Sequence, residues 1–436
     1  MARKKFSGKM KVALNGRCVG MLGRASSGAT SFSYASDWLS WDSAFPISLS
    51  LPLQTKKFIG APVVAVFENL LPDEDIVRRR LAERVGAGGS DAFSLLAKIG
   101  RDCVGALQFL PGDEPIPSVG SVDREEISES GIAQILRDLR MNPLGVSTED
   151  DRDFRISIAG AQEKTALLQI DGSWHEPVGA TPTTHILKPQ IGLLPNGLDM
   201  SRSVENEHFC MRLCEALGLE TADTEILDFE DMRVLSVRRF DRVWTKDGRL
   251  LRLPQEDFCQ ALSVPPSLKY NSQGGPGFVE CLRLLQTSDD PASDQRLFIK
   301  AQIVFWAMAA TDGHAKNFSI FLQPGGRFTM TPLYDVLSAQ PNFDAGELRR
   351  RQLKLAMAVG SNRHYPIYEI TPRHFAQSAK AAALSSQMVD EVIEEIKLGL
   401  DDALERTIAS MPEDFPMEMA HGIADGMRNR LAGQTA

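Results

Sequence analysis

The sequence predicts an α+β protein with a strand-rich first part and a largely helical last part, and three observations lead to this prediction. Short apolar runs bounded by turn residues occupy most of the chain up to about residue 255. Beyond that point, apolar residues recur at the spacing of a helix face. The chain is 43% hydrophobic and 24% charged, which is ordinary for a globular protein, and its 436 residues suffice for about two to four domains.

The first region is expected to begin with a β-hairpin. Two apolar runs within residues 10–23 flank Asn15-Gly16, a pair that strongly favours a two-residue hairpin turn. Residues 31–39 and 46–54 are predicted to be further extended segments.

Two helices are expected in the rest of this region, one on each side of a Pro- and Gly-rich stretch at 110–123. The first begins at about Asp73, because acidic residues come early in it and arginines later, as the helix dipole favours. The second is short and amphipathic, and its apolar face is formed by Ile132, Ile135, Leu136 and Leu139.

The middle of the chain returns to strands. Segments 165–170 and 184–188 are predicted to be strands, and Asp171-Gly172 makes a tight turn after the first of them. The helix that follows is expected to stop at Gly218, because glycine readily adopts the left-handed conformation that ends helices.

The C-terminal part begins with a predicted helix that has a wide apolar face, within residues 296–310. A polar loop at 311–317 and a strand at 318–322 are expected to follow. A turn at Gly325-Gly326 then leads into a second strand that ends in Asp335. Most of the remaining chain is expected to be helical.

Three polar residues of this loop and hairpin have the spacing of a phosphoryl-transfer site. Such a site needs a group that orients the attacking hydroxyl, hard oxygen ligands for a metal, and a cation on the phosphates. Asp312 is followed by Asn317 five positions later and by Asp335 after the hairpin, as in protein kinases. Asp312 is therefore the candidate catalytic base, and Asn317 and Asp335 are the candidate Mg²⁺ ligands. The first two residues alone would also fit an ordinary polar loop, and it is Asp335 that favours the site.

A nucleotide-binding segment is expected upstream of this loop. Gly160 lies in a short loop before one predicted strand, and Lys188 ends the next. That lysine is predicted to pair with the α- and β-phosphates of ATP and to be held by Glu207 or Glu205 on the following helix. The loop has a single glycine, so it matches neither the dinucleotide motif nor the P-loop. Lys316 is placed to contact the transferred phosphate.

Charge and cysteine usage limit the classes of function. The net charge of −9 argues against electrostatic binding of nucleic acid by this chain alone and suits a basic protein partner. Six cysteines form no CxxC pair and no cluster with zinc spacing. Cys210 and Cys214 are either half of a metal site or two core residues of a helix, and the second reading is favoured. No signal peptide or membrane span is evident, so a reduced, cytoplasmic protein is expected.

Together these segments resemble the HipA family of bacterial toxin kinases, along nearly the whole chain. The resemblance rests on long motifs such as ENLLPDEDIVR, GRDCVGAL, SIAGAQEKTALL, HILK, RRFDR, LPQEDFCQAL, KYNSQGGPG, TDGHAKNFSIFL and PLYDVLS. It implies a two-lobed protein-kinase-like fold akin to the phosphoinositide-3/4-kinases, with an N-terminal β-rich subdomain and a helical C-terminal lobe. The expected domains are an N-terminal subdomain at 1–115, a connecting helical segment at 116–150, a kinase N-lobe at 151–255 and a helical C-lobe at 256–436.

The resemblance further implies a serine/threonine kinase that uses ATP and Mg²⁺. It implies a HipB-like DNA-binding antitoxin as partner, which neutralises the toxin and represses the operon with it, so that operator DNA is met mainly through the antitoxin. The family's best-known target is an aminoacyl-tRNA synthetase, glutamyl-tRNA synthetase, whose phosphorylation arrests growth and yields persister cells. A small-molecule kinase and a non-catalytic corepressor are the alternatives. The four intact residues Lys188, Asp312, Asn317 and Asp335 argue against the corepressor.

Functional positions of the family transfer to this sequence one by one. The catalytic acid falls on Asp312 and a self-phosphorylated serine on Ser157. A DNA-contacting lysine falls on Lys380, whereas a second basic position of the family is Ala383 here. The adenine-side segment often begins with an acidic residue, and Arg238 stands there instead. Nucleotide contacts are expected at Ala159, Gly160, Ala161, Gln162, Glu163, Lys164, Lys188, Arg238, Arg239, Phe240, His314, Ala315, Lys316, Asn317, Tyr334 and Asp335.

Overall fold

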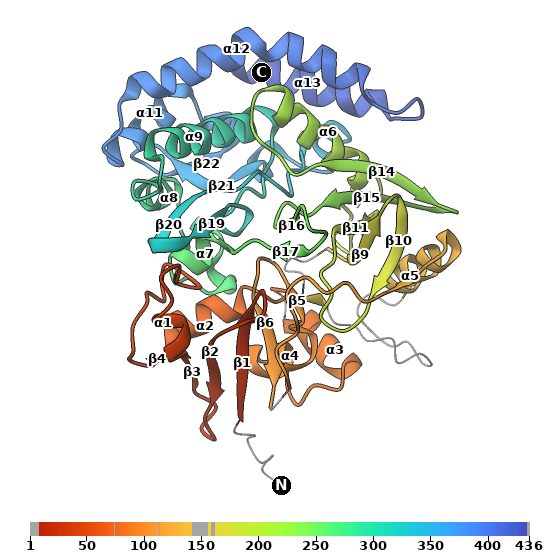
Figure 1. The fold of residues 1–436 in the computed structure, drawn as a ribbon. Helices are drawn as coiled ribbons and strands as arrows, with labels where there is room; N and C mark the ends of the chain where they lie inside the picture. Colours follow the sequence, from red (N-terminus) through yellow and green to blue (C-terminus); the bar gives the residue numbers. More distant parts are fainter. Residues whose placement is uncertain (1–7, 74, 113, 142–155, 158–161, 434–436) are drawn as a thin grey trace.

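An N-terminal domain packs against a two-lobed core, and the predicted α+β class is confirmed (Figure 1). In Figure 1 the N-terminal domain lies at the bottom, a strand-rich lobe at the right and a helical lobe at the top. The computed structural model describes residues 8–73, 75–112, 114–141, 156–157 and 162–433.

The N-terminal domain is built on a five-stranded antiparallel sheet in the order β4-β3-β2-β1-β6. Asn15 and Gly16, both with positive φ, form the turn between β1 and β2, so the predicted hairpin is confirmed. The extended segment predicted at 31–39 is only half right, because β3 ends at Tyr34 and a short helix follows. The elements are β1 (Gly8–Leu14), β2 (Arg17–Arg24), β3 (Thr30–Tyr34), α1 (Ser36–Leu39), β4 (Phe58–Ile59), α2 (Ala61–Glu68), α3 (Asp75–Arg84), α4 (Ala92–Ile99), β5 (Asp102–Cys103) and β6 (Gln108–Pro111).

The segment 46–54 forms neither strand nor helix, so the prediction of an extended strand there is wrong. Its polar groups bond to the core instead of to a sheet. The Ser50 hydroxyl donates to the Gln260 carbonyl at 2.8 Å, and the Leu49 N–H donates to a Glu256 carboxylate oxygen at 2.8 Å. This segment therefore attaches the N-terminal domain to the helical lobe.

The strand-rich lobe is a six-stranded antiparallel sheet in the order β14-β15-β11-β9-β10-β7. Helix α5 covers one face, where Ile132 packs with Leu187 and Val234 in a small separate core. Neighbouring Leu235 points to the opposite face, which α6 covers, and joins the main core. The predicted strands, the turn after β9 and the helix with its glycine stop are confirmed. The elements are β7 (Arg124–Glu126), α5 (Glu129–Met141), β8 (Ile156–Ser157), β9 (Thr165–Ile170), β10 (Ser173–Pro177), β11 (His185–Pro189), β12 (Gly192–Leu193), β13 (Asp199–Met200), α6 (Ser203–Ala216), β14 (Thr224–Phe229), β15 (Met232–Arg238), β16 (Arg242–Trp244) and β17 (Leu250–Arg252).

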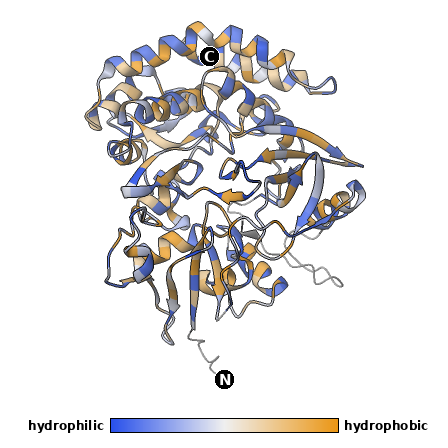
Figure 2. Ribbon diagram, in the orientation of Figure 1, coloured by the Kyte–Doolittle hydropathy of each residue, from blue (hydrophilic) through white to orange (hydrophobic). Residues whose placement is uncertain are grey.

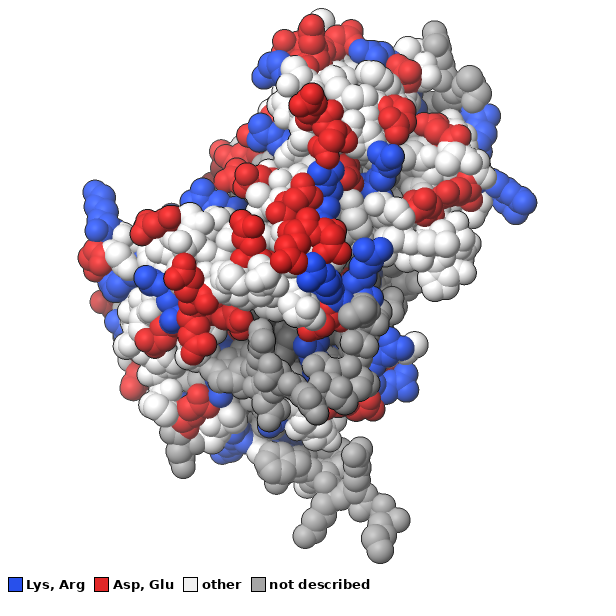
Figure 3. Space-filling view, turned by 90° about the vertical axis from the view of Figure 1, so that its right-hand side faces the viewer, with Lys and Arg blue, Asp and Glu red and all other residues white. Residues whose placement is uncertain are grey.

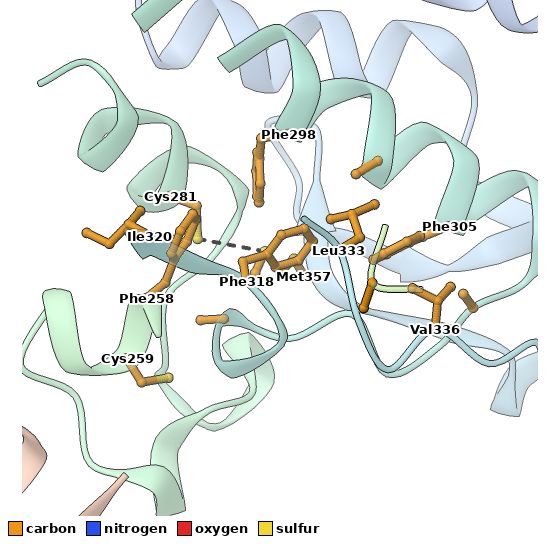
Figure 4. Packing of buried hydrophobic residues seen from close by; sticks show 14 of the residues in the cluster. Phe258, Cys259, Cys281, Phe298, Phe305, Phe318, Ile320, Leu333, Val336 and Met357 are labelled. Carbon is orange, nitrogen blue, oxygen red and sulfur yellow. Dashed lines mark hydrogen bonds between the residues drawn. The ribbon is translucent and has the colours of Figure 1, made fainter. Parts of the chain in front are cut away.

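The helical lobe surrounds α9, which is buried on nearly every side rather than on one face. Phe298 and Phe305 of this helix face Phe318, the residue that follows the polar loop at 311–317 (Figure 4). The lobe also contains a three-stranded sheet and a hairpin, so it is less purely helical than expected. The elements are β18 (Gln255–Asp257), α7 (Phe258–Ala261), α8 (Phe278–Leu285), α9 (Pro291–Met308), β19 (Ser319–Gln323), β20 (Arg327–Met330), α10 (Gln340–Asp344), β21 (Lys354–Val359), β22 (His364–Pro366), α11 (Pro372–Ala381), α12 (Ser386–Ala409) and α13 (Met417–Leu431).

The outer helices α12 and α13 each bury one side. Hydrophobic and hydrophilic residues alternate along both helices in Figure 2, as helices that cover a core require. No helix in the described part of the chain is long and apolar enough to cross a membrane. On the face drawn in Figure 3, Asp and Glu side chains gather in a band through the upper half of the molecule, in accord with the negative net charge.

A buried cluster of charges joins the N-terminal domain to the strand-rich lobe. The Asp102 carboxylate accepts hydrogen bonds from Arg242 at 2.8 Å, Arg252 at 3.1 Å and Arg239 at 3.2 Å. It also accepts one from the Thr183 hydroxyl at 2.7 Å. Burial alone would raise the pKa of Asp102, but the three guanidinium groups outweigh burial and hold it below its ordinary value.

Replacing Asp102 by Asn is expected to destabilise the protein by about 3–5 kcal/mol. The buried Arg252 loses the carboxylate that it contacts, and Arg239 and Arg242 lose one of two, the other being Asp241. The difference from the parent should be complete at pH 7. It should shrink below about pH 4, since a carboxyl with a depressed pKa loses its stabilising effect as it is protonated. Urea unfolding followed by tryptophan fluorescence measures both effects. Asp171→Asn, at an exposed turn with positive φ, is the control and should change stability by less than about 0.5 kcal/mol. An Asp102→Asn variant as stable as its parent would contradict the prediction.

Candidate active site

The polar loop after α9 brings Asp312 and Asn317 together. The Asn317 amide nitrogen donates to the Asp312 carbonyl at 2.9 Å, which leaves the Asn317 amide oxygen available to a ligand. The Asp312 side chain is 57% exposed and Asn317 is buried. Gly313 lies between them, where a Cβ atom would come within 2.5 Å of the Phe305 ring. Packing against α9 therefore fixes the loop and presents Asp312 to solvent.

Strand β20 ends at Met330 and not in Asp335 as predicted. Asp335 follows the β19–β20 hairpin in a left-handed conformation, with φ of 61°. This conformation is unfavourable for a residue other than glycine, so its neighbours must hold it. The Tyr334 hydroxyl donates to the Lys316 carbonyl at 3.0 Å and lies 2.6 Å from the Ser319 hydroxyl. These bonds join the residue before Asp335 to the polar loop.

Lys188 joins the two lobes at this point. Its ammonium group donates to Glu207 at 2.7 Å and to Asp335 at 2.8 Å. Glu205 instead accepts from Gln190 at 2.7 Å and pairs with Arg233 at 3.3 Å. Of the two carboxylates predicted from the sequence, Glu207 is therefore the partner.

The charges of this triad shift the pKa values of its members. Burial would lower the pKa of Lys188, but the charges of Asp335 and Glu207 outweigh burial and raise it. The pKa of Asp335 is held below its ordinary range, because Lys188 and Lys164 outweigh its burial. Burial raises the pKa of Glu207 despite its lysine partner, and the negative charge of Asp335 adds to this.

Most of the predicted residues line a cavity of about 690 Å³ between the lobes. Glu163 and Ala315 were also predicted as nucleotide contacts but are not part of its lining, and Ala315 is buried in the core. Gln255 contributes a buried amide oxygen that has no hydrogen-bond partner, so this wall of the cavity can accept a bond from a donor group of a ligand. Sequence reasoning did not identify Gln255. The lining includes Gln162, Lys164, Lys188, Arg238, Arg239, Phe240, His314, Lys316, Asn317, Tyr334 and Asp335, together with Asp312.

The nucleotide loop is only partly described. Residues 159–161 lie outside the described part of the chain. Gln162 donates to the Pro189 carbonyl at 3.1 Å. Burial raises the pKa of Glu163 to about 7, and burial together with the charge of Lys188 lowers the pKa of Lys164 to about 8.

The three residues of the predicted adenine-side segment take different positions. Arg238 is largely exposed, and the guanidinium of Arg239 belongs to the buried Asp102 cluster. Phe240 packs its ring against Tyr334, with ring centroids 5.9 Å apart. Phe240 is therefore the side chain of this segment best placed to contact a flat ring in the cavity.

The N-terminal domain contributes a residue that sequence reasoning missed. Asp73 forms an ion pair with Lys316, and it accepts a hydrogen bond from Lys269 at 2.7 Å. Lys316, predicted to contact a phosphate, is therefore bound to Asp73 in this structure. Burial would raise the pKa of Asp73, but the two lysines outweigh it and lower it. The motifs ENLLPDEDIVR and KYNSQGGPG contained Asp73 and Lys269, but no local pattern assigned them to the site.

The other candidate residues are Ser157, Lys380 and the two cysteines of α6. The strand that contains Ser157, β8, pairs in parallel with β5, so that Ser157 lies opposite Cys103; the side chain of Ser157 is outside the described part. Lys380 is an exposed residue in the last turn of α11. Cys210 and Cys214 are buried thiols, and burial raises the pKa of both. No cluster of three potential metal-binding side chains occurs within the described residues.

Known proteins share both halves of this architecture. The family model of the HipA N-terminal domain matches residues 10–110, and that of the HipA-like C-terminal domain matches residues 156–404. The chain is 36% identical to the putative kinase Y4mE of Sinorhizobium fredii, over 93% of this chain and 92% of that protein. It is 30% identical to the serine/threonine-protein kinase toxin HipA of Shewanella oneidensis, over 78% of this chain and 76% of that protein. A solved complex of Shewanella oneidensis HipA with HipB and operator DNA has the same fold, with a TM-score of 0.77, 24% identity and coverage of 98% of this chain and 96% of that chain.

Replacing Glu207 by Gln is expected to weaken binding of Mg-ATP, because Lys188 would lose the carboxylate that fixes it in the cavity. A loss of roughly 10- to 100-fold in affinity is expected, as for other partners that orient a binding group. Isothermal titration with Mg-ATP measures it. Glu205→Gln, two residues earlier on α6 and bonded to other residues, is the matched control. Equal affinities of the two variants would show that Glu207 has no special role.

Proposed function

This chain belongs to the HipA family of toxin kinases, and from that premise we propose that it transfers the γ-phosphate of ATP to a serine of a protein substrate. The observation that carries the proposal is the convergence of Lys188, Glu207 and Asp335 beside the loop of Asp312 and Asn317. These groups come from separate parts of the chain, and a phosphoryl-transfer site requires each of them.

Each residue has a defined role in the proposed transfer. Asp312 accepts the hydrogen bond of the acceptor hydroxyl and orients it, and its exposure leaves it accessible to a protein substrate. Lys188 binds the phosphates of ATP, and Phe240 packs beside the adenine. Asn317 and Asp335 have the hard oxygen atoms that Mg²⁺ prefers, and phosphate oxygens complete such a site; the ion neutralises phosphate charge when bound.

Two alternative functions are less well supported. A small-molecule kinase would use the same acidic loop, but both HipA domains match this chain and one relative is named a serine/threonine-protein kinase. A non-catalytic corepressor would not need an intact triad around Lys188. Phosphate appearing on protein rather than on a metabolite separates the first alternative from the proposal.

We further propose that the chain is a toxin with a HipB-like antitoxin as partner. A relative with the same fold was solved with HipB and its operator DNA. Because this chain is acidic, DNA contact is expected mainly through the antitoxin, with Lys380 as a candidate direct contact. An aminoacyl-tRNA synthetase such as glutamyl-tRNA synthetase is the proposed substrate. Its phosphorylation would arrest growth and promote persistence.

Replacing Asp312 by Asn is expected to leave the fold and Mg-ATP binding intact while lowering phosphate transfer roughly 10²- to 10⁴-fold. The measurement is transfer of labelled phosphate from Mg-ATP to protein, together with growth after induction. Asp390→Asn, at an exposed position of α12, is the control and should behave like the parent. Undiminished transfer and toxicity in Asp312→Asn would reject the kinase proposal.

Ser157 is proposed to be phosphorylated between molecules and to inactivate the kinase. A phosphate adds about −1.5 to −2 charges next to a loop that must hold the anionic tail of ATP. An inactive, tagged Asp312→Asn chain incubated with the parent and Mg-ATP should therefore gain phosphate on Ser157, detected by mass spectrometry. The phosphorylated fraction should bind ATP weakly. Phosphate absent from Ser157, or normal ATP binding by the modified chain, would reject this regulation and leave the kinase proposal standing.

A further inference from the structure

Tyr270 contacts the candidate catalytic base directly, and we propose that it is a positioning residue for phosphoryl transfer. Its hydroxyl donates to Asp312 Oδ1 at 2.5 Å. More than half of the Asp312 side chain remains exposed, so one carboxylate oxygen is held and the other is open to solvent. The inference rests on the proposed kinase function, in which the open oxygen receives the hydrogen bond of the acceptor serine.

The ring of Tyr270 is itself fixed on two sides. The rings of Tyr270 and His314 form an edge-to-face contact, with centroids 4.9 Å apart and planes at 79°. The ammonium group of Lys269 lies 5.3 Å from the centre of the Tyr270 ring and is bonded to Asp73 of the N-terminal domain. The tyrosine therefore has one position relative to Asp312, set by the polar loop and by the N-terminal domain together.

The segment that carries Tyr270 is shaped by its glycines. The Gly275 N–H donates to the Tyr270 carbonyl at 3.0 Å, and a Cβ atom on Gly275 would lie 1.8 Å from the Leu268 carbonyl oxygen. Gly274 adopts a φ of 94°, which only glycine takes readily. The glycine pair in KYNSQGGPG thus makes the tight turn that places Tyr270 next to Asp312. This gives a role to a motif that lies outside the loop of Asp312 and Asn317.

The protonation state of Tyr270 agrees with a donor role. Burial, followed by the negative charge of Asp312, raises the pKa of its hydroxyl well above the ordinary value. The hydroxyl therefore stays protonated and donates throughout the physiological range. A side-chain carboxylate held through one oxygen loses less conformational freedom when it engages the acceptor, so the effect should appear in kcat rather than in ATP affinity.

Replacing Tyr270 by Phe removes only the hydroxyl and preserves the ring contacts, so the variant should fold. The acceptor is a bacterial lysate whose own kinases have been inactivated by heat, with labelled Mg-ATP as donor. Tyr270→Phe is expected to lower kcat roughly 10- to 100-fold, the range for hydrogen-bond partners that orient a functional side chain. The KM for ATP and the Kd for Mg-ATP should stay within about twofold of the parent. Tyr368→Phe is the matched control and should retain full activity, because its half-buried ring packs on Phe343 and Arg350 and its hydroxyl interacts with Arg430 instead of Asp312.

A second measurement tests the contact between Tyr270 and Asp312 without an activity assay. If Tyr270 acts through Asp312, the two residues are energetically coupled. The decreases in Tm of the single variants Tyr270→Phe and Asp312→Ala should then sum to more than the decrease in the double variant. Strict additivity, an unchanged or increased kcat in Tyr270→Phe, or phosphate on Tyr270 itself would each overturn the positioning role. Such a result with an active parent rejects only this role, whereas a parent that transfers no phosphate to any protein rejects the kinase proposal as well.

Discussion

The buried ammonium group of Lys188 is the charge on which the arrangement of the lobes depends. It lies between Glu207 of α6 and Asp335 beyond the β19–β20 hairpin, and it is almost completely removed from solvent. An uncompensated charge at that depth would be strongly unfavourable, so the strand, the helix and the loop must stay together. Asp335, which is only partly buried, is the carboxylate of the pair that remains accessible to a ligand from the cavity.

The same principle makes the N-terminal domain part of the site rather than an attachment. Asp102 forms ion pairs with three arginines, one within the predicted adenine-side segment and two after it, and Asp73 pairs with Lys316 of the polar loop. Both carboxylates belong to the N-terminal domain, and both are held below their ordinary pKa by cations of the core. Removing this domain would take from Arg252 and Lys316 the carboxylates that they contact, whereas Arg239 and Arg242 would keep only Asp241. The two lobes alone are therefore not expected to keep the polar loop at 311–317 in place.

Local sequence patterns predicted the elements whose formation depends on residues close together in the chain. The Asn15-Gly16 hairpin, α9 and the Asp312–Asn317 loop all follow from turn chemistry, periodicity and position along the chain. The choice between Glu207 and Glu205 could not be made this way, because both lie in the first turns of α6 and only the packing of that helix directs one toward Lys188.

Features that depend on long-range contacts escaped the sequence analysis. Residues 46–54 have the alternation of a strand, but they bond to the Tyr34 hydroxyl and to Gln260 and Glu256, about 200 positions away. Helix α2 is apolar up to its last residue, Glu68, with little periodicity, and was not anticipated. Tyr270 and Asp73 reach the catalytic loop only through tertiary structure, although both belong to motifs that supported the family resemblance.

A network around Asn206 explains how strained backbone near the site can be maintained. Asn206 precedes Glu207 on α6, and its amide group exchanges two hydrogen bonds with the backbone of Ser338, at 2.8 and 2.9 Å. The Ser338 hydroxyl in turn donates to the Met308 carbonyl, at the end of α9. The next residue, Ala309, is left-handed like Asp335, and each such conformation costs on the order of 1 kcal/mol or more. The bonds of Asn206 and Ser338 hold the segments on both sides of Asp312 to the helix that carries Glu207. Strain at the two ends of the site is therefore offset by the same helix that positions Lys188, and the catalytic geometry and the closure of the lobes form one cooperative unit.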